Sequence, residues 1–436
     1  MVIYELLFII IMIWLVVFVI TKDLFSPTSL LCMSYILAVV CAIYNIENWQ
    51  IDLHYNTVGI IVLGILCFAI FEVFYIFLHS RKSKFTNKSK INDEEKIKYL
   101  EIPKNKITLL NFINFVIFVI YLYFFLKALN LSGSNLSFSG AMQRYRSLTM
   151  FKNVQMIPTL VNFLIKYCRA LAFIVTYVII NNFIITGKMQ IKREYLWSIL
   201  IYIPITLMSG GRYDLIVYIL YMIVLWSILN RLKNGNIDFS KIVKISLIII
   251  IVLILFANIK FLVGRQEKMD TIGYITQYFG GSIQIFDMYM QEIYKPSESF
   301  GQETFASLRK FLNQIGFLEE LNNSDTARIF RKAPDGTVIG NVYTGFRKMY
   351  QDFGVFGLIL LQSLLSLIYC KLYYSSLRIE RIENVSYKIM VYSTISFCII
   401  LHSFSEVFYS TVISFNYGIL FLMMYFIIKF IFAYKL

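Results

Sequence analysis

Long apolar stretches, separated by short polar ones, run through all 436 residues of the chain. Each stretch approaches the length of about 20 apolar residues that a bilayer-spanning helix needs. About eleven such helices are expected, at residues 1–20, 28–46, 57–79, 107–129, 158–180, 194–209, 212–230, 245–262, 353–375, 388–409 and 412–433. The pattern predicts an all-α, polytopic membrane helix bundle.

Lys and Arg gather in four polar segments, and this sets the expected orientation, because short basic loops stay in the cytoplasm. The segments are 81–106, 188–193, 231–244 and 371–388. Threading eleven helices through them places the N-terminus outside and the C-terminus inside the cell. We therefore expect eight N-terminal transmembrane helices in residues 1–262, an extracytoplasmic loop region in 263–352, and three C-terminal helices in 353–436.

The loop region 263–352 is too long for a simple connection between two helices. Residues 303–317 carry apolar side chains at helical spacing, which predicts short amphipathic helices lying over the bundle. The half-hydrophobic piece at 272–286 is expected to form an interfacial or re-entrant helix.

Composition narrows the class of protein. Hydrophobic residues make up 58% and charged residues 15%, which excludes a soluble globular protein. Only 20 Gly and 6 Pro occur, and no internal repeat is visible, which argues against a transporter with broken helices. The six Cys show no metal-ligand spacing, only three His occur, and D-x-D and P-loop motifs are absent. No cofactor, metal or nucleic acid is expected.

Two groups of basic residues are candidates for binding an anion. Arg144 and Arg146 lie in an outer segment, 137–152, that contains no acid. Arg matches phosphate oxygens in a bidentate way, although a solvated or headgroup-binding loop would have the same composition. Lys166 and Arg169 share one face of the fifth helix, where charges face either a cavity or a partner. Glu72 in the third helix is one possible partner if their role is structural.

Further candidate site residues lie where helices are expected to reach the outer face of the membrane. Arg212 follows two glycines in the turn 209–214, beside a helix N-terminus that favours an anion. Arg265 follows the eighth helix, and Tyr343, Arg347 and Asp352 precede the ninth.

His402 and Glu406 are four residues apart on the expected tenth helix, so one is expected to orient the other. Either is suited to act as a general base, or the pair forms a polar contact that holds helices together.

Three segments resemble the bacterial oligosaccharide repeat-unit polymerases, the Wzy-type enzymes of O-antigen and capsule synthesis. They are SGGRYDL at 209–215, YFGGSIQIFD at 278–287 and NVYTGFRKMYQDFGVFG at 341–357. Length, helix count and the long loop before the last helices are also similar. The resemblance implies a GT-C-like membrane enzyme of the bacterial inner membrane.

The resemblance also implies the chemistry. Two undecaprenyl-diphosphate-linked glycans react on the extracytoplasmic face, and undecaprenyl diphosphate leaves by a single, inverting displacement without a metal. Diphosphate or glycan binding is then assigned to Arg212, with Arg144, Arg146, Arg265, Arg347, Tyr343, Lys166 and Arg169 as helpers. Glu406 assisted by His402 is the expected base, with Asp352 as the alternative. A flippase and a chain-length-regulating co-polymerase are the expected partners.

Three other classes of protein remain open. A lipid-linked oligosaccharide flippase would share the basic cavity, but it is expected to show two repeats and more Gly and Pro. A glycosyltransferase using a lipid-monophosphate sugar would place an acid in the first outer loop, where Glu47 and Asp52 are available. An O-antigen ligase is the third alternative.

Overall fold

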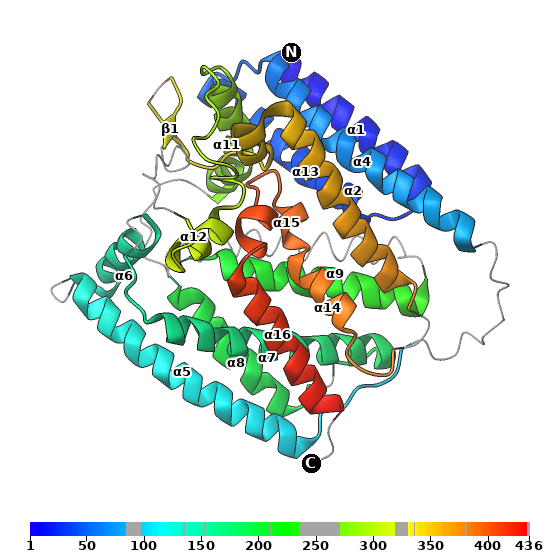
Figure 1. The fold of residues 1–436 in the computed structure, drawn as a ribbon, viewed down its shortest axis with the longest axis vertical. Helices are drawn as coiled ribbons and strands as arrows, with labels where there is room; N and C mark the ends of the chain where they lie inside the picture. Colours follow the sequence, from blue (N-terminus) through cyan, green and yellow to red (C-terminus); the bar gives the residue numbers. More distant parts are fainter. Residues whose placement is uncertain are drawn as a thin grey trace. The chain divides into compact units, whose positions relative to one another are not determined.

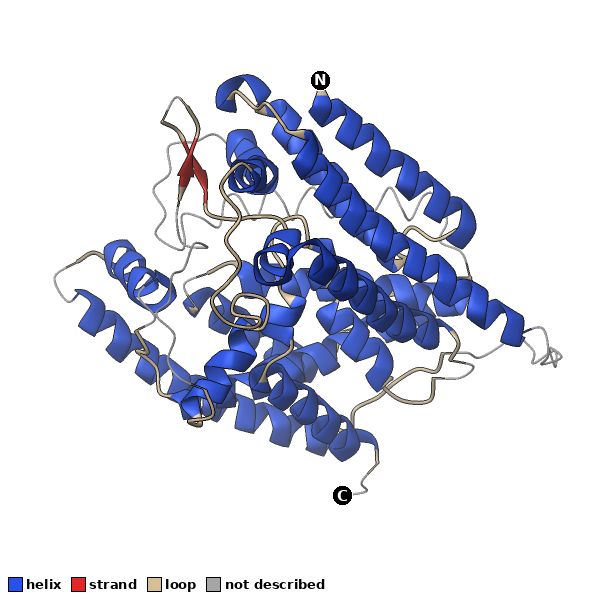
Figure 2. Cartoon of the chain, turned by 45° about the horizontal axis from the view of Figure 1, so that its top comes forward, coloured by secondary structure: helices blue, strands red, loops and turns tan. Residues whose placement is uncertain are grey.

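The computed structural model describes residues 1–83, 97–133, 136–151, 154–189, 191–209, 211–235, 271–318, 330–334, 336–379 and 382–433. Most of them are helical (Figures 1 and 2). The α-helices are α1 Val2–Thr21, α2 Pro27–Tyr44, α3 Ile46–Trp49, α4 Tyr55–Ser83, α5 Lys104–Gly133, α6 Phe138–Arg146, α7 Thr159–Thr186, α8 Arg193–Met208, α9 Tyr213–Asn234, α11 Thr271–Met290, α12 Ala306–Gln314, α13 Phe346–Leu377, α14 Tyr387–Ile395, α15 Phe397–Ile400 and α16 Phe415–Phe432. Two π-helical turns, η2 Ser147–Phe151 and η5 Phe408–Val412, and a small hairpin, β1 Arg331–Lys332 with β2 Val338–Gly340, complete these elements.

Eight helices in the described part of the chain are long and apolar enough to cross a membrane: α1, α2, α4, α5, α7, α9, α13 and α16. Each lies where the hydrophobic pattern predicts a span, so the prediction of an all-α, multi-pass membrane bundle is confirmed. The helix α8 also lies where a span is predicted, but it has only 16 residues. The predicted span at 245–262 lies outside the described residues.

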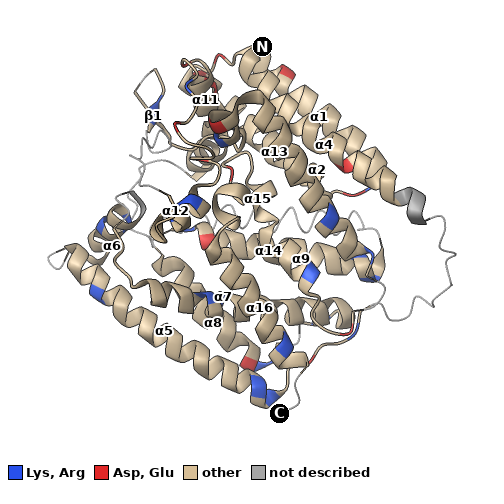
Figure 3. Ribbon diagram, viewed as in Figure 1, with Lys and Arg blue, Asp and Glu red and all other residues tan. Residues whose placement is uncertain are grey.

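The surfaces of the longest helices are apolar. Only 22% of the most apolar window of α1 and 28% of that of α5 are buried inside the protein, and long parts of α1, α4, α5 and α13 carry no charged residue (Figure 3). Exposed apolar patches of this extent are typical of a surface that contacts lipid.

The chain packs as two compact units. The first contains Met1–Asn92, Asp270–Ser375 and Ile395–Phe415, and the second contains Asp93–Met269, Ser376–Thr394 and Asn416–Leu436. Each unit is built from stretches that are far apart in the sequence. The three segments predicted from the sequence are consecutive, because they follow the expected order of membrane spans and loops.

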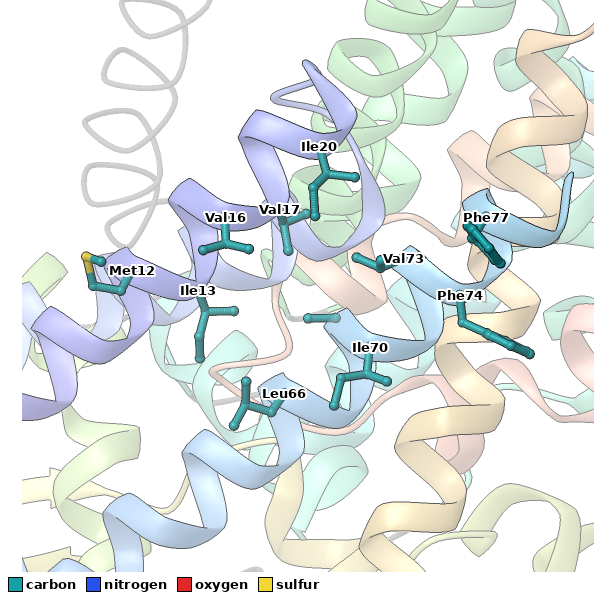
Figure 4. Close-up of a pocket in the computed structure, with 11 residues that line it drawn as sticks. Met12, Ile13, Val16, Val17, Ile20, Leu66, Ile70, Val73, Phe74 and Phe77 are labelled. Atoms are coloured by element: carbon teal, nitrogen blue, oxygen red, sulfur yellow. The ribbon is translucent and has the colours of Figure 1, made fainter. Parts of the chain in front are cut away.

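In the first unit, α1, α2 and α4 pack side by side, and α11 packs along α2 (Figure 1). The contact between α11 and α2 is close because Gly280 has no side chain: a Cβ there would lie 2.5 Å from the backbone nitrogen of Ala42. A helix is thus confirmed at 272–286. Between α1 and α4 lies an apolar groove of about 650 Å³, lined by side chains such as Val16, Leu66 and Phe74 (Figure 4).

In the second unit, α7 packs against α5, α8 and α9. Polar contacts join the segments at one end of these helices. The amide of Asn182, near the end of α7, bonds both backbone groups of Leu100, and Lys233 donates to the carbonyl of Ile184. Ile97 forms a β-bridge with Ile382. Lys192 also pairs with Glu101. Four segments that the positive-inside pattern assigns to one side of the membrane therefore meet at one end of this unit.

The predicted tenth helix, 388–409, is wrong in its second half. The α-helical structure ends with α15 at Ile400; residues 401–404 form turns, and residues 405–407 are irregular before the π-helical turn η5. Tertiary hydrogen bonds take the backbone groups that a continuing helix would use: Gly345 donates to the carbonyl of His402, and the amide of Ser403 donates to Ser34. His402 and Glu406 therefore do not share a helical face.

The ninth predicted helix starts earlier than the expected residue 353. Its counterpart α13 begins at Phe346 and bends at Gly354, which has φ 63° and ψ −159°. That conformation is essentially restricted to glycine. The bend separates the first two turns, which carry Arg347 and Asp352, from the more apolar remainder of α13. A short amphipathic helix is confirmed within 303–317, where α12 forms, while the β1–β2 hairpin was not expected.

Candidate functional site

The helix α7 carries a charged group in the interior of the second unit. The side chain of Arg169 is only 14% exposed, and its Nη1 lies 3.8 Å from Oδ1 of Asp214 on α9. Its Nη2 donates to the hydroxyl of Tyr417 at 3.3 Å, and the guanidinium stacks 5.2 Å from the ring of Phe173. The buried Nε has no hydrogen-bond acceptor among the described residues. The charge of Arg169 is thus compensated only in part, because the distance of 3.8 Å to Asp214 is too long for a direct hydrogen bond.

Lys166 lies one turn before Arg169 on α7. Its Nζ donates to the carbonyl of Asn162 at 3.1 Å and lies 4.4 Å from the centre of the Phe163 ring. Two cations at this spacing repel each other. An anion bound beside them would relieve that repulsion and accept the unused donors.

Glu72, which the sequence offered as a possible partner of these cations, is engaged within its own unit. Glu72 lies in the first unit, where its carboxylate accepts the amide of Thr28 at 2.6 Å and the hydroxyl of Tyr374 at 2.5 Å. Asp214 is the acidic partner of Arg169 instead.

The glycine-containing turn 209–212 joins α8 to α9, as the sequence predicts. Ser209 donates to the carbonyl of Thr206 at 2.7 Å and accepts the amide of Gly211 at 3.4 Å, which closes the turn. Arg212 is the N-cap residue of α9 and only 5% exposed, and Asp214 follows in the first turn. Because Asp214 also faces Arg169, the structure brings the turn and α7 together.

The helix α6 places its two arginines at the same end of the second unit. Tyr145 on α6 is buried and meets the ring of Phe125 edge-on at 5.6 Å. It shares an apolar cluster with Val161 near the start of α7 and Met208 at the end of α8. Arg144 and Arg146 flank Tyr145 and therefore lie near the end that holds the turn 209–212.

In the first unit, a second group of charges surrounds the start of α13. The buried Arg347 makes two hydrogen bonds with Glu303, one of 3.1 Å, and stacks 4.7 Å from the centre of the Tyr343 ring. Arg331 donates to the Tyr343 hydroxyl at 3.1 Å and pairs with Glu292. The hydrogen bond to Glu292 raises the pKa of the Arg331 guanidinium. Both arginines are thus paired with carboxylates.

Asp352 holds the preceding loop against α13. Its carboxylate accepts hydrogen bonds from Ser297 Oγ at 2.5 Å, from the amide of Thr304 at 2.7 Å and from the amide of Glu303 at 3.1 Å. This set of donors is typical of a carboxylate that fixes a loop.

The two remaining candidate bases, Glu406 and His402, are almost completely buried, each 1% exposed. Glu406 accepts the amides of Tyr409 at 2.6 Å and Ser410 at 3.0 Å, and Lys348 donates to its carbonyl at 2.9 Å. These bonds cap the π-helical turn η5.

Both ring nitrogens of His402 are engaged. Nδ1 lies 3.0 Å from the hydroxyl of Tyr35, and Nε2 lies 2.9 Å from the amide nitrogen of Gln362. A Cβ at Gly345 would lie 2.5 Å from the imidazole. The glycine of the NVYTG segment is thus required by the packing against His402.

A histidine that the sequence did not single out has a different environment. His54 lies just before α4. Its ring nitrogen Nδ1 is 3.0 Å from Oδ2 of the buried Asp287, and the His54 side chain is 51% exposed. No motif marks this pair, because 233 residues separate its members. The signal available in the sequence was a lone His in the first loop that is predicted to lie outside, and an acid in the YFGGSIQIFD segment.

Arg265, a predicted helper, lies outside the described residues. Within the described residues, no group of three or more His, Cys, Asp and Glu side chains is placed to hold a metal ion. Compared with known proteins, the chain matches no family model, no curated protein and no solved structure.

Proposed function

We propose that this chain is a bacterial oligosaccharide repeat-unit polymerase, a glycosyltransferase that joins undecaprenyl-diphosphate-linked repeat units into an O-antigen or capsular polysaccharide. The observation that carries the proposal is Arg169, an arginine within a membrane-spanning helix whose charge is only partly compensated by Asp214. Keeping such a charge inside a membrane is costly unless it binds a partner or a substrate.

The leaving diphosphate is the group that this arrangement suits. Negative charge grows on its oxygens as the glycosidic bond to the lipid breaks, and charge-assisted hydrogen bonds strengthen with it. Arg169 offers an unused donor, Lys166 adds a second cation, and Arg212 lies at the N-terminus of α9, where the helix dipole favours an anion. In this proposal Arg144 and Arg146 help to hold the lipid-linked glycan at the same end.

The proposed architecture, stereochemistry and partners follow from the resemblance to the repeat-unit polymerases. The enzyme has about eleven transmembrane helices in a GT-C-like bundle, with the N-terminus outside and the C-terminus in the cytoplasm. Transfer is a single displacement that inverts the anomeric centre. A flippase supplies the lipid-linked units, and a co-polymerase sets the length of the product.

Deletion of the gene, followed by electrophoresis of the surface polysaccharide, tests this function. Loss of the polymer ladder with retention of a single capped repeat unit is the expected result. Loss of even the single unit, with lipid-linked units accumulating inside the cell, would identify a flippase instead.

Complementation of the deletion tests the site. Arg169→Gln should fail to restore the ladder although the protein reaches the membrane. Lys106→Gln is the matched control, because Lys106 is another buried cation of the second unit, bonded to the carbonyls of Phe430 and Ile431. If Lys106→Gln and Arg169→Gln restore the ladder equally, the diphosphate assignment is wrong.

A further inference from the structure

His54 and Asp287 form a fixed pair between the start of α4 and α11. The backbone amide of His54 donates to Oδ1 of Asp287 at 3.0 Å, and the ring Nδ1 lies 3.0 Å from Oδ2. Thr57 donates to Oδ1 at 2.5 Å. Asp287 is 3% exposed and receives these three contacts, so its carboxylate has one fixed orientation.

This contact selects the tautomer of the imidazole. An ionised carboxylate only accepts hydrogen bonds, so the neutral ring carries its proton on Nδ1 and leaves a lone pair on Nε2. No described residue forms a hydrogen bond with Nε2 of His54, and half of the side chain is exposed. Since the buried Asp287 covers the Nδ1 edge, the exposed edge is the one that carries Nε2.

The surroundings hold His54 in place on both sides. Its carbonyl accepts the amides of Thr57 and Val58 at 3.1 and 3.2 Å and so caps α4. Trp49, five residues before His54, is buried in a cluster with Ile285, two residues before Asp287, and with Tyr343. The first loop therefore packs on the segment 330–345, and both lie at the same end of the first unit. That end is the outer one in the proposed orientation.

We propose that His54 is the general base of the glycosyl transfer and that Asp287 is its positioning residue; this inference rests on the proposed function. Nε2 of His54 accepts the proton of the acceptor sugar hydroxyl while the hydroxyl oxygen forms a bond to the anomeric carbon of the donor. The bond from that carbon to the diphosphate oxygen breaks, and undecaprenyl diphosphate leaves with the electron pair. His54 then releases the proton to water.

The same geometry explains why the buried candidates suit this role less. Both ring nitrogens of His402 are engaged, and the carboxylates of Glu406 and Asp352 hold backbone amides of the protein. His54 combines an oriented ring with an exposed nitrogen, which a base needs in order to reach a sugar hydroxyl. Asp52 and Tyr55 are also exposed beside it and are available to contact the acceptor glycan.

The test uses the full-length protein in vesicles, with lipid-linked repeat units extracted from the deletion strain as the probe. His54→Asn is the decisive variant, because its amide nitrogen can replace Nδ1 as donor to Asp287 while nothing replaces Nε2. A base predicts that turnover falls by about 100-fold or more, whereas a helix clamp predicts near-normal turnover. His54→Ala should be equally slow, and added imidazole should restore part of its activity, which a structural role would not permit.

Asp287→Asn tests the positioning role. The Asn amide would donate to Nδ1 and move the ring proton to Nε2, so kcat should fall while KM for the lipid-linked unit stays the same. Thr57→Val is the matched control, because it removes a contact to Asp287 without changing the tautomer, and it should retain most of the wild-type kcat.

The experiment separates a failure of the His54 assignment from a failure of the polymerase proposal. If the wild-type protein elongates the probe and His54→Asn does so equally well, the assignment of His54 is wrong and the polymerase proposal stands. If the wild-type protein does not elongate the probe, the polymerase proposal fails, and the role of His54 fails with it.

Discussion

Arg212 combines burial with a position at the N-terminus of α9, and the type of cation it provides should therefore matter. Arg212→Ala should abolish polymer formation in cells while the protein still reaches the membrane. Arg212→Lys should fail too, because Lys offers a point charge in place of the planar fork that binds two phosphate oxygens. Electrophoresis of the surface polysaccharide checks both variants. A normal ladder from Arg212→Ala would remove Arg212 from the diphosphate site.

The two arginine–carboxylate pairs near the start of α13 differ in burial. The side chains of Arg347 and Glu303 are 2% and 16% exposed, whereas those of Arg331 and Glu292 are 19% and 51% exposed. Glu303→Gln would remove the carboxylate that makes two hydrogen bonds with the buried guanidinium, and breaking a buried ion pair in this way typically costs about 3–5 kcal/mol. Glu292→Gln should cost about 0–1 kcal/mol, because water screens that pair.

Thermal unfolding of the purified protein in detergent measures this difference. The expected order is a large fall in Tm for Glu303→Gln and a small one for Glu292→Gln. Equal shifts would show that Arg347 does not depend on Glu303 for its charge compensation.

At the scale of elements, the adjacent glycines of the YFGGSIQIFD segment have separate roles. A Cβ on Gly280 would lie 2.5 Å from backbone atoms of α2, which cannot move without separating the helices. A Cβ on Gly281 would lie 3.0 Å from a methyl group of Ile339, a side chain that can adjust. Gly280→Ala should therefore reduce the amount of folded protein in the membrane, and Gly281→Ala should reduce it far less.

Fluorescence-detected size-exclusion chromatography of tagged variants measures the folded fraction. The pair is closely matched, since the two substitutions are chemically identical and one residue apart. If Gly281→Ala proves the more harmful, α11 does not approach α2 as closely as the structure shows.

The helices could be predicted where the local hydrophobic pattern determines the structure. They could not be predicted where contacts with residues far away in the sequence determine it. The helices α1 and α5 each contain a long apolar window and lie where the sequence predicts them. The end of the tenth predicted helix depends on Gly345 and Ser34, far away in the sequence. Likewise the spacing of Lys166 and Arg169 indicated a shared helical face, but only the fold shows that Asp214 is the partner.

The same distinction applies to the candidate bases. The sequence favoured His402 and Glu406 because they are close together in the chain, and helical spacing would have placed them on one face. His54 precedes α4 and Asp287 lies in α11, 233 residues further along the chain, so no local pattern connects them. Their relation became visible only through the packing of α11 against the start of α4.

At the scale of the whole molecule, the orientation in the membrane decides whether the proposed chemistry is possible. In the proposed reaction the lipid-linked units react on the extracytoplasmic face, so that proposal requires the loop 45–54 to lie outside and the basic loops to lie inside. Asn48 and Lys188 are exposed residues of these two kinds of loop. In spheroplasts, a membrane-impermeant maleimide should label Asn48→Cys without permeabilisation, and Lys188→Cys only after it.

The native cysteines allow this experiment without prior removal. Five of the six are buried, and Cys67, which is partly exposed, lies in the membrane-spanning helix α4, so the unmodified protein should give little labelling. The opposite pattern, with Lys188→Cys labelled from outside and Asn48→Cys protected, would invert the topology. His54 would then face the cytoplasm and be separated from the glycans, whereas the expected pattern places it on the face where those glycans are joined.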